Sequence, residues 1–342
     1  MRQGQNPAKM GLPAYQPKRL GILLLVYIPN QDGFFAESLD IFRYQVASIH
    51  RNTRVEFNLF VFDNGSCAEV QEAMRAMQSE GLIDWLTLSS HNMGKAGALN
   101  WAIKAMPNEL ICYSDGDVYF RPGWFEKSLG LLEAFPKVGM VTAQPCFFDS
   151  LDGKGQAHLA LRESVLYELS DCLANPDTAQ EYVRSIGDKL ELHTRYSQHH
   201  WQVATNKEVG VEAIVGASPF QFIGYKAMLE QITPLSNATA MKGDRQIFIQ
   251  MEQLGFLQLS TREALVYHMG NKLDETAVRE TQRDRLGEIL AKPVLQVNPS
   301  QSQVSSRRRF AMGMLQRFGQ IPFFKGLIQR IYNLLFEYLA QV

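Results

Sequence analysis

The sequence has few cysteines, almost no net charge and no long apolar run in its first half. Its four cysteines are far apart along the chain and show no spacing typical of a metal site, which suits a protein of a reducing compartment. A formal net charge of −1 gives no electrostatic argument for a nucleic-acid partner. The longest early apolar run, Leu20 to Ile28, is far too short to span a bilayer.

The amino-terminal segment 1–19 is polar, contains prolines and lacks the apolar core of a signal peptide. We therefore expect a flexible tail there, and a cytoplasmic protein. With 342 residues, the chain is long enough to bury a large core, either as one domain or as two closely joined ones.

Apolar strands and amphipathic helices alternate over residues 20–145. Leu20 to Ile28 and Val55 to Phe62 have the composition of buried strands, and Ser66 with Glu69 predicts a capping box at the start of the next helix. Further strands are expected over 85–89, 110–117 and 138–143. Such alternation implies right-handed crossovers and a mostly parallel sheet, so we predict an α/β fold of the nucleotide-binding type.

The pattern changes after Pro145. Residues 151–210 are richer in polar and helical segments, and no strand alternation is clear before the apolar stretch that follows them. A helix is expected over 241–255 and a last strand over 264–268. We assign residues 146–271 to an acceptor-binding half and residues 272–306 to a linker.

Two aspartates follow the apolar run that starts at Leu110. Asp115 and Asp117 flank Gly116 at the carboxyl end of a central strand, the edge at which open α/β sheets bind ligands. Glycine lets the backbone turn closely around a bound group, and carboxylates are hard oxygen ligands for Mg²⁺ or Mn²⁺. A divalent ion held there would neutralise a diphosphate. The alternative is a solvated Asp-Gly turn between two elements.

With these motifs in view, residues 20–270 resemble the family-2 glycosyltransferases of the GT-A fold. The resemblance is carried, in the correct order, by VFDNGS, NMGKAGALNWAI, SDGDVYF, GDRQ and a late YHMGN. Each motif is weak alone, and their order makes the assignment. The resemblance implies a Rossmann-like nucleotide-binding half fused to an acceptor half, a nucleotide-sugar donor, a divalent metal and usually inversion at the anomeric carbon.

The resemblance assigns donor contacts to four places in the first half. Asp63 matches the acidic residue that hydrogen-bonds the donor's base or ribose, unless it is an ordinary Asx-turn aspartate. Pro29 and Asn30 take the family's position beside the base. Gly94 and the small residues after it let a helix start approach the diphosphate, and Lys95 either adds a charge there or is a solvated surface lysine.

The metal site is also implied by the resemblance. Asp117 would bind Mn²⁺ or Mg²⁺ directly, and Asp115 would reach the ribose or the water shell of the metal. His268 matches the late histidine that completes the coordination in many members. Its alternative is a structural histidine at a strand end.

The resemblance places the catalytic base at Asp244, because an inverting transfer needs a carboxylate to take the proton from the acceptor hydroxyl. The family's usual pair of adjacent acids is reduced here to Gly243-Asp244, and Asp244 could instead be only a helix N-cap. Arg245 either holds a phosphate or pairs with a carboxylate. Gly216 and Ala217 match the family's small-residue loop near the donor sugar and are assigned to the acceptor side.

Residues 307–342 combine basic residues with aromatic and leucine side chains, and Pro322 divides them into two amphipathic segments. Such a tail suits the surface of an anionic membrane. The alternative is that its apolar face docks on the catalytic domain or on a second subunit. A membrane span is disfavoured because Lys325 and Arg330 interrupt the apolar run.

Together these features predict a cytoplasmic, metal-dependent, inverting glycosyltransferase. They are compatible with an oligomer and with a peripheral location on the inner face of the cell membrane. The donor would be a nucleotide sugar, a UDP-sugar first, and the acceptor a saccharide or lipid-linked molecule of surface polysaccharide or glycolipid synthesis. Two alternatives stay open. One is a catalytically silent homologue that binds sugar nucleotides or acts as a scaffold. The other is a sugar-1-phosphate nucleotidyltransferase, which needs a GxGTR-type loop where this sequence has VYIPNQDG.

Overall fold

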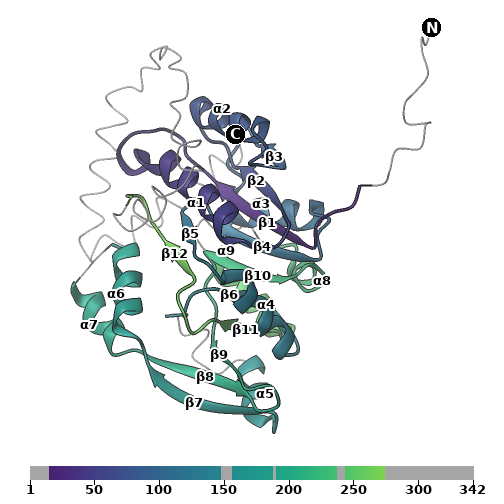
Figure 1. Cartoon of the computed structure of the whole chain (residues 1–342), viewed down its shortest axis with the longest axis vertical. Coiled ribbons are helices and arrows are strands. Elements are labelled where there is room, and N and C mark those ends of the chain that lie inside the picture. Colours follow the sequence, from purple (N-terminus) through teal and green to yellow (C-terminus); the bar gives the residue numbers. More distant parts are fainter. Residues whose placement is uncertain (1–14, 148–155, 188–189, 237–242, 274–342) are drawn as a thin grey trace.

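The computed structural model describes residues 15–147, 156–187, 190–236 and 243–273 (Figure 1). The basic tail predicted over 307–342, and the predicted linker from residue 274 onward, lie outside these residues. Within the described residues, no helix has the length and apolar composition that crossing a bilayer requires.

A ten-stranded sheet forms the centre of the described chain, in the order β3-β2-β1-β4-β10-β6-β11-β9-β8-β7. Its strands are β1 (Leu20–Val26), β2 (Phe57–Asp63), β3 (Trp85–Leu88), β4 (Leu110–Asp115), β6 (Val138–Thr142), β7 (Tyr167–Leu173), β8 (His200–Asn206), β9 (Val211–Val215), β10 (Gln221–Tyr225) and β11 (Leu257–Ser260). Strands β1 to β4 are parallel to one another. Because β10 is antiparallel to both β4 and β6, β6 also runs in their direction. The parallel α/β arrangement predicted for residues 20–145 is therefore confirmed.

Helices cover both faces of the sheet. They are α1 (Ser38–Asn52), α2 (Ala68–Ser79), α3 (Gly94–Ala105), α4 (Trp124–Ala134), α5 (Gln156–Glu163), α6 (Pro176–Ser185), α7 (Leu190–Ser197), α8 (Lys226–Leu229) and α9 (Gly243–Gln253), with short 3-10 helices η2 (Gly33–Phe35) and η4 (Glu230–Ile232). Side chains of α1, α2 and α4 share one buried cluster, and those of α3 and α9 share another. The sheet is thus the middle layer of three.

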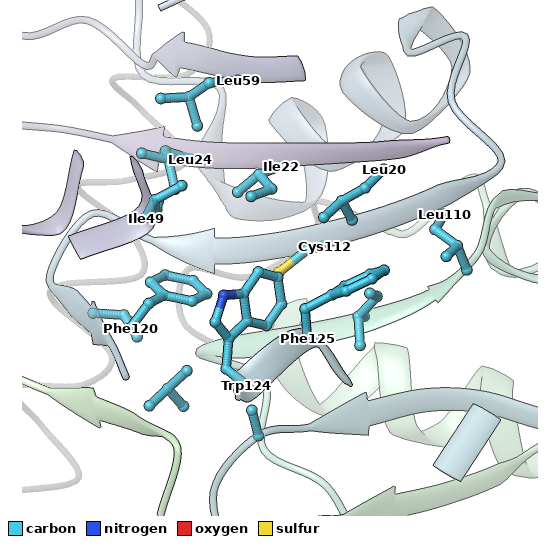
Figure 2. Close-up of a cluster of buried hydrophobic side chains, with 14 of the residues drawn as sticks. Leu20, Ile22, Leu24, Ile49, Leu59, Leu110, Cys112, Phe120, Trp124 and Phe125 are labelled. Atoms are coloured by element: carbon cyan, nitrogen blue, oxygen red, sulfur yellow. The ribbon is translucent and has the colours of Figure 1, made fainter. Parts of the chain in front are cut away.

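Strand β1 shows why the central strands read as continuous apolar runs. Leu20, Ile22 and Leu24 face the cluster of α1, α2 and α4, and Leu23 between them faces the cluster of α3 and α9. A strand buried on both faces needs apolar residues at every position. Figure 2 shows the first of these clusters, in which Trp124 of α4 lies beneath Cys112 of β4 and beside Phe120.

Strands β7, β8, β10 and β11 were not expected from the sequence. Edge strand β7 is mostly exposed and carries Glu168, Ser170 and Asp171, so it lacks the apolar alternation that marks a strand. Strand β10 is five residues long and is recognisable mainly from its place between β4 and β6. This placement brings the loop before β10 next to the Asp-Gly-Asp turn.

A second, two-stranded sheet lies beside the first. It pairs β5 (Val118–Phe120) with β12 (Val266–His268) in antiparallel register, with His268 opposite Val118. The strand predicted over 110–117 ends earlier, at Asp115, as β4, and the Asp-Gly-Asp turn joins it to the separate strand β5. Helix α1 packs against β5.

The predicted capping box at Ser66 and Glu69 is wrong. Helix α2 begins at Ala68 after the N-cap Cys67, which makes no side-chain capping bond. The Ser66 hydroxyl instead accepts a hydrogen bond of 2.9 Å from the backbone N–H of Ile28. A long-range partner has taken the oxygen that local reasoning assigned to the helix.

Candidate functional site

The predicted donor residues gather at the carboxyl ends of β1, β2 and β4. Strand β1 lies between the other two, and its register aligns Val26 with Asp63 and Leu25 with Asp115. Neighbouring strands are about 4.8 Å apart, so the two aspartates lie roughly 10 Å from each other along this edge. Asp117 follows two residues later, in the turn between β4 and β5.

Asp63 is fully buried, and both of its carboxylate oxygens have hydrogen-bond donors within the protein. Oδ1 accepts from the backbone N–H of Ser66 at 3.0 Å, and Oδ2 accepts from Nε2 of Gln71 at 2.8 Å. This is a structural role of the kind that the alternative interpretation describes, although the bond reaches three residues along the chain and not the two of an Asx turn, and it fixes the loop after β2. A contact from Asp63 to the donor stays a prediction.

Lys95 is not a solvated surface lysine. Its Nζ lies 3.1 Å from Oδ1 of Asp115, donates to the backbone oxygen of Pro219 at 2.9 Å, and lies 5.0 Å from the centre of the Tyr113 ring. The Tyr113 hydroxyl also donates to the Asp115 carboxylate. Two side-chain donors from different elements, α3 and β4, thus orient the Asp115 carboxylate. Sequence reasoning missed Tyr113, which reads simply as part of the apolar strand.

Asp117 and His268 are brought together by the pairing of β5 with β12. Nε2 of His268 lies 3.3 Å from Oδ2 of Asp117, and the ring of Phe220 packs against the imidazole at 5.4 Å between centroids. Oδ1 of Asp117 and Nδ1 of His268 are buried and make no hydrogen bond. Burial, with the Asp115 charge adding to it, raises the pKa of Asp117, while His268 and Lys95 oppose the rise.

These two side chains fit a divalent cation. A buried carboxylate oxygen without a donor costs free energy, and a cation beside it would relieve that cost. Carboxylate and imidazole are also ligands that Mn²⁺ accepts. In the described residues, however, no three His, Cys, Asp or Glu side chains converge into a possible metal cluster. Asp115 is engaged by Lys95 instead of completing a triad with Asp117 and His268.

Two asparagines shape the loop that precedes α3. Gly94 has a φ of 71°, and its N–H donates to Oδ1 of Asn92 at 2.8 Å. Asn64 donates to the same oxygen at 2.9 Å and accepts from the N–H of Met93 at 2.7 Å. The loops after β2 and β3 are therefore locked together at the start of α3. Neither asparagine was singled out by the sequence, although Asn64-Gly65 is a recognisable turn signal.

The remaining predicted residues of this edge have mixed surroundings. Asn30 is exposed, and its Oδ1 accepts from the N–H of Asp32 at 3.0 Å, while Pro29 before it is half-buried. Gly216 has a φ of 121°, and Ala217 is buried in the core rather than exposed to a ligand. The loop they begin reaches Lys95 and Asp115 through the backbone oxygens of Pro219 and Phe220.

The predicted base lies at the start of α9. Asp244 and Arg245 occupy the first turn of that helix, and their side chains lie outside the described residues. Ile247 and Met251 pack α9 into the same cluster as Tyr113 and α3. The backbone therefore places Asp244 on the face of the sheet that carries Lys95.

A separate polar cavity of about 410 Å³ lies between α6 and the two-stranded β5–β12 sheet. Arg121 and Glu181 form an ion pair in its wall, and Tyr267 lies under the Arg121 guanidinium. Adjacent residues of a strand point to opposite faces, so Tyr267 and the cavity lie on the other side of the two-stranded sheet from His268. The remaining lining residues are Asn175, Asp177, Thr178, Gln180, Arg184 and Ala264.

Comparisons with known proteins give one family. Residues 35–190 match the family model described as glycosyl transferase family 2. No curated protein sequence matches the chain.

Solved structures that resemble the chain include the mannosyltransferase PcManGT from Pyrobaculum calidifontis in complex with GDP-Man and Mn²⁺, at a TM-score of 0.43 and 16% identity over 78% of this chain and 61% of that one. The structure of GalNAc-T7 with UDP, GalNAc and Mn²⁺ resembles it at a TM-score of 0.44 and 9% identity, over 74% of this chain and 43% of that one. The structure of residues 1–349 of S. aureus TarS has a TM-score of 0.41 and 12% identity, over 80% of this chain and 65% of that one. The chain therefore spans 43% to 65% of the length of these structures.

Proposed function

We propose that the glycosyl transferase family 2 domain matched over residues 35–190 moves a sugar from a nucleotide-sugar donor to a hydroxyl group of a saccharide or lipid-linked acceptor, in surface polysaccharide or glycolipid synthesis. A UDP-sugar is the first donor to test. The single observation that carries the proposal is the grouping of charged side chains where β4 ends. Asp115 and Lys95 lie on one side of Gly116, and Asp117 and His268 on the other.

Each side of this turn suits a different part of the donor. The Asp115 carboxylate is oriented by Tyr113 and Lys95, so it can accept a hydrogen bond from a ribose hydroxyl. Asp117 and His268 would hold Mn²⁺ or Mg²⁺, which when bound neutralises the diphosphate as its charge develops. The amino end of α3 lies at the same edge of the sheet, since Lys95 in its first turn contacts Asp115, and the helix dipole there favours the same diphosphate.

The transfer itself needs a base on the acceptor side. The acceptor oxygen attacks the anomeric carbon opposite the bond to the diphosphate, that C–O bond breaks, and its electron pair leaves with the nucleoside diphosphate. Asp244 takes the proton from the attacking hydroxyl, and the single displacement from the face opposite the diphosphate inverts the anomeric carbon. Its position in the first turn of α9, on the Lys95 face of the sheet, supports this role.

The composition of residues 307–342 supports an acceptor at a membrane surface, with the protein on the cytoplasmic side. Basic residues attract anionic headgroups, and the phenylalanines and leucines among them can enter the interface. Cosedimentation of the full chain with vesicles that contain anionic lipid tests this part. Binding that is unchanged when Arg307, Arg308 and Arg309 are replaced by glutamine would contradict it.

The donor experiment tests the core of the proposal. The purified full chain is incubated with Mn²⁺ and each of several nucleotide sugars, and the released nucleoside diphosphate is measured. We expect release with one donor and loss of release in Asp117→Asn. Binding of a donor without any release, with diverse acceptors present, would favour a silent homologue. Pyrophosphate release from a nucleoside triphosphate and a sugar-1-phosphate would instead identify a nucleotidyltransferase.

A further inference from the structure

Helix α1 carries a stripe of buried polar residues on the face that packs against β5. Gln45, Ser48 and Asn52 are 0%, 1% and 6% exposed, and their spacing of three and four residues places them on one side of the helix. Burying an amide or a hydroxyl is unfavourable unless it is hydrogen-bonded. Apolar residues would fill this face at lower cost, so the bonds that these side chains make identify what the stripe does.

The stripe binds the backbone on both sides of the Asp-Gly-Asp turn. Nε2 of Gln45 donates to the backbone oxygen of Asp115 at 2.7 Å and to Oγ of Ser114 at 3.0 Å. Beyond the turn, Oγ of Ser48 accepts from the N–H of Phe120 at 3.0 Å, and Nδ2 of Asn52 donates to the oxygen of Phe120 at 2.7 Å. One rigid helix therefore holds the segment that enters the turn and the segment that leaves it.

The turn also lies close to β1. A Cβ at Gly116 would lie 3.2 Å from the backbone oxygen of Leu25, so the turn has little room to shift toward that strand. With β1 on one side and α1 on the other, the backbone of the turn is held between these two elements, and the Gln45 bond fixes it on the side of α1. A movement of 1 Å there is enough to disturb a ligand site.

Stability alone does not explain Gln45. Its Oε1 is buried and has no hydrogen-bond partner, which disfavours the folded state. The oxygen of Asp115 already accepts from Oγ of Ser114 at 2.9 Å, so it would not be orphaned if Gln45 were absent. A methionine of similar size would remove the unpaired oxygen and keep the packing.

We propose that Gln45 is a positioning residue for sugar transfer, because it fixes the turn that presents Asp115 and Asp117 to the donor and its cation. This inference rests on the proposed function, since it concerns the same site. On this inference the polar stripe of α1 serves the site at the end of β4, whereas the apolar residues of the same helix serve the hydrophobic core.

Asn108 provides a matched control at the opposite end of β4. It is 1% exposed, its Nδ2 donates to the backbone oxygen of Lys18 at 2.7 Å and to Oδ1 of Asn58 at 3.1 Å, and its own Oδ1 is buried without a partner. Gln45→Met and Asn108→Leu therefore remove similar amides from similar surroundings, and only the first lies next to the Asp-Gly-Asp turn.

The test compares Mn²⁺ binding and turnover in the full chain. Free Mn²⁺ is followed by electron paramagnetic resonance during titration, with and without nucleoside diphosphate, and nucleoside diphosphate release is measured over a range of Mn²⁺ concentrations. We expect Gln45→Met to weaken Mn²⁺ binding and to lower kcat/KM by about 10–100-fold, the range for residues that orient metal ligands. Asn108→Leu should leave both unchanged.

Wild-type Mn²⁺ affinity in Gln45→Met would overturn the inference, and so would an equal loss in Asn108→Leu. If Gln45→Met does not fold, Ser48→Ala, which removes the acceptor for the Phe120 N–H and a local bond to the backbone oxygen of Gln45, should weaken Mn²⁺ binding in the same direction. Should the wild type bind Mn²⁺ but release no nucleoside diphosphate from any donor, the proposed function fails, and the binding comparison still decides the role of Gln45.

Discussion

The two ends of β1, β2 and β4 carry buried polar groups of different kinds. At the amino end, Asn58 accepts hydrogen bonds from Asn108, from the backbone of Lys18 and from the Tyr15 hydroxyl, and no charge is buried in that set. At the carboxyl end, Asp63, Asp115 and Asp117 lie within a few residues of the strand ends. The same three strands thus end in neutral amides on one side and in aspartates on the other.

The surface charges sharpen this contrast. Near the amino end, Lys18 pairs with Glu56 at 2.8 Å and Arg19 pairs with Glu109 at 3.2 Å, with side chains that are largely exposed. Pairs of this kind contribute little to stability. At the carboxyl end, burial raises the pKa of Asp117, and one of its oxygens has no donor. Ionisable groups with a perturbed pKa concentrate where a protein binds or reacts, so from this comparison we expect stability to depend on the amino end and function on the carboxyl end.

The largest expected effect comes from removing a charge at the carboxyl end. Asp117→Asn should lower kcat/KM for nucleoside diphosphate release by more than the roughly 10–100-fold that changes around metal ligands cause. Mn²⁺ should no longer stimulate the residual rate. The matched change at the amino end, Glu56→Gln, breaks an exposed ion pair and should leave the rate unchanged. Equal rates in the wild type and Asp117→Asn would mean that Asp117 is not a metal ligand.

A smaller effect is expected at Lys95. Lys95→Met removes a cation from Asp115, and we expect about tenfold lower kcat/KM, the equivalent of one charge-assisted hydrogen bond. The partly exposed pair is screened by solvent, so the free energy of unfolding should fall by only about 1–2 kcal/mol. Enzyme assays and urea denaturation measure the two quantities. Lys18→Met at the amino end is the control, and a similar drop in its kcat/KM would remove the distinction between the ends.

Substitutions at Asp63 and Gln71 distinguish the two interpretations of the Asp63 carboxylate, a contact to the donor and a purely structural role in the loop after β2. Asp63→Asn loses one acceptor in a fully buried site, so we expect the free energy of unfolding to fall by about 1–3 kcal/mol. Gln71→Met removes one of the same hydrogen bonds from the other side. If Asp63 also contacts the donor, only Asp63→Asn should raise the donor KM. Equal KM values in both variants would leave Asp63 with the structural role alone.

The part of this comparison that the sequence predicts is the part encoded by local patterns. The parallel strands β1, β2 and β4 follow from their apolar runs, and the acidic turn follows from Asp115 and Asp117 at a strand end. The sequence could not predict that Lys95 would contact Asp115 rather than solvent, because that contact depends on the packing of α3 against β1 and β4.

The missing predictions share a physical cause. From the sequence, Gln45 is an ordinary helix residue, because its partner, the backbone oxygen of Asp115, lies 70 residues later in the chain. Tyr113 is an ordinary strand residue, because its partner Asp115 ends the same apolar strand and is itself assigned to the donor. Ser66 forms a bond to Ile28 that competes with the local capping box. Strand β10 becomes a strand through its neighbours on both sides. Local propensity identifies elements, and long-range hydrogen bonds decide which polar groups serve the site.

The smallest effect concerns pH and returns to Asp117. Because its pKa is raised in the folded protein, the folded state binds this proton more tightly than the unfolded state does. The free energy of unfolding should therefore fall as pH rises from the ordinary aspartate range through the raised pKa, in buffer with a chelator. Asp117→Asn lacks this titration, so the difference between the two thermal-denaturation series isolates it. Adding Mn²⁺ should reverse the slope for the wild type alone, because a bound cation requires the deprotonated carboxylate. If Mn²⁺ leaves the slope unchanged, Asp117 has a raised pKa but does not bind the metal. The carboxyl end would then differ from the amino end only in its charged groups.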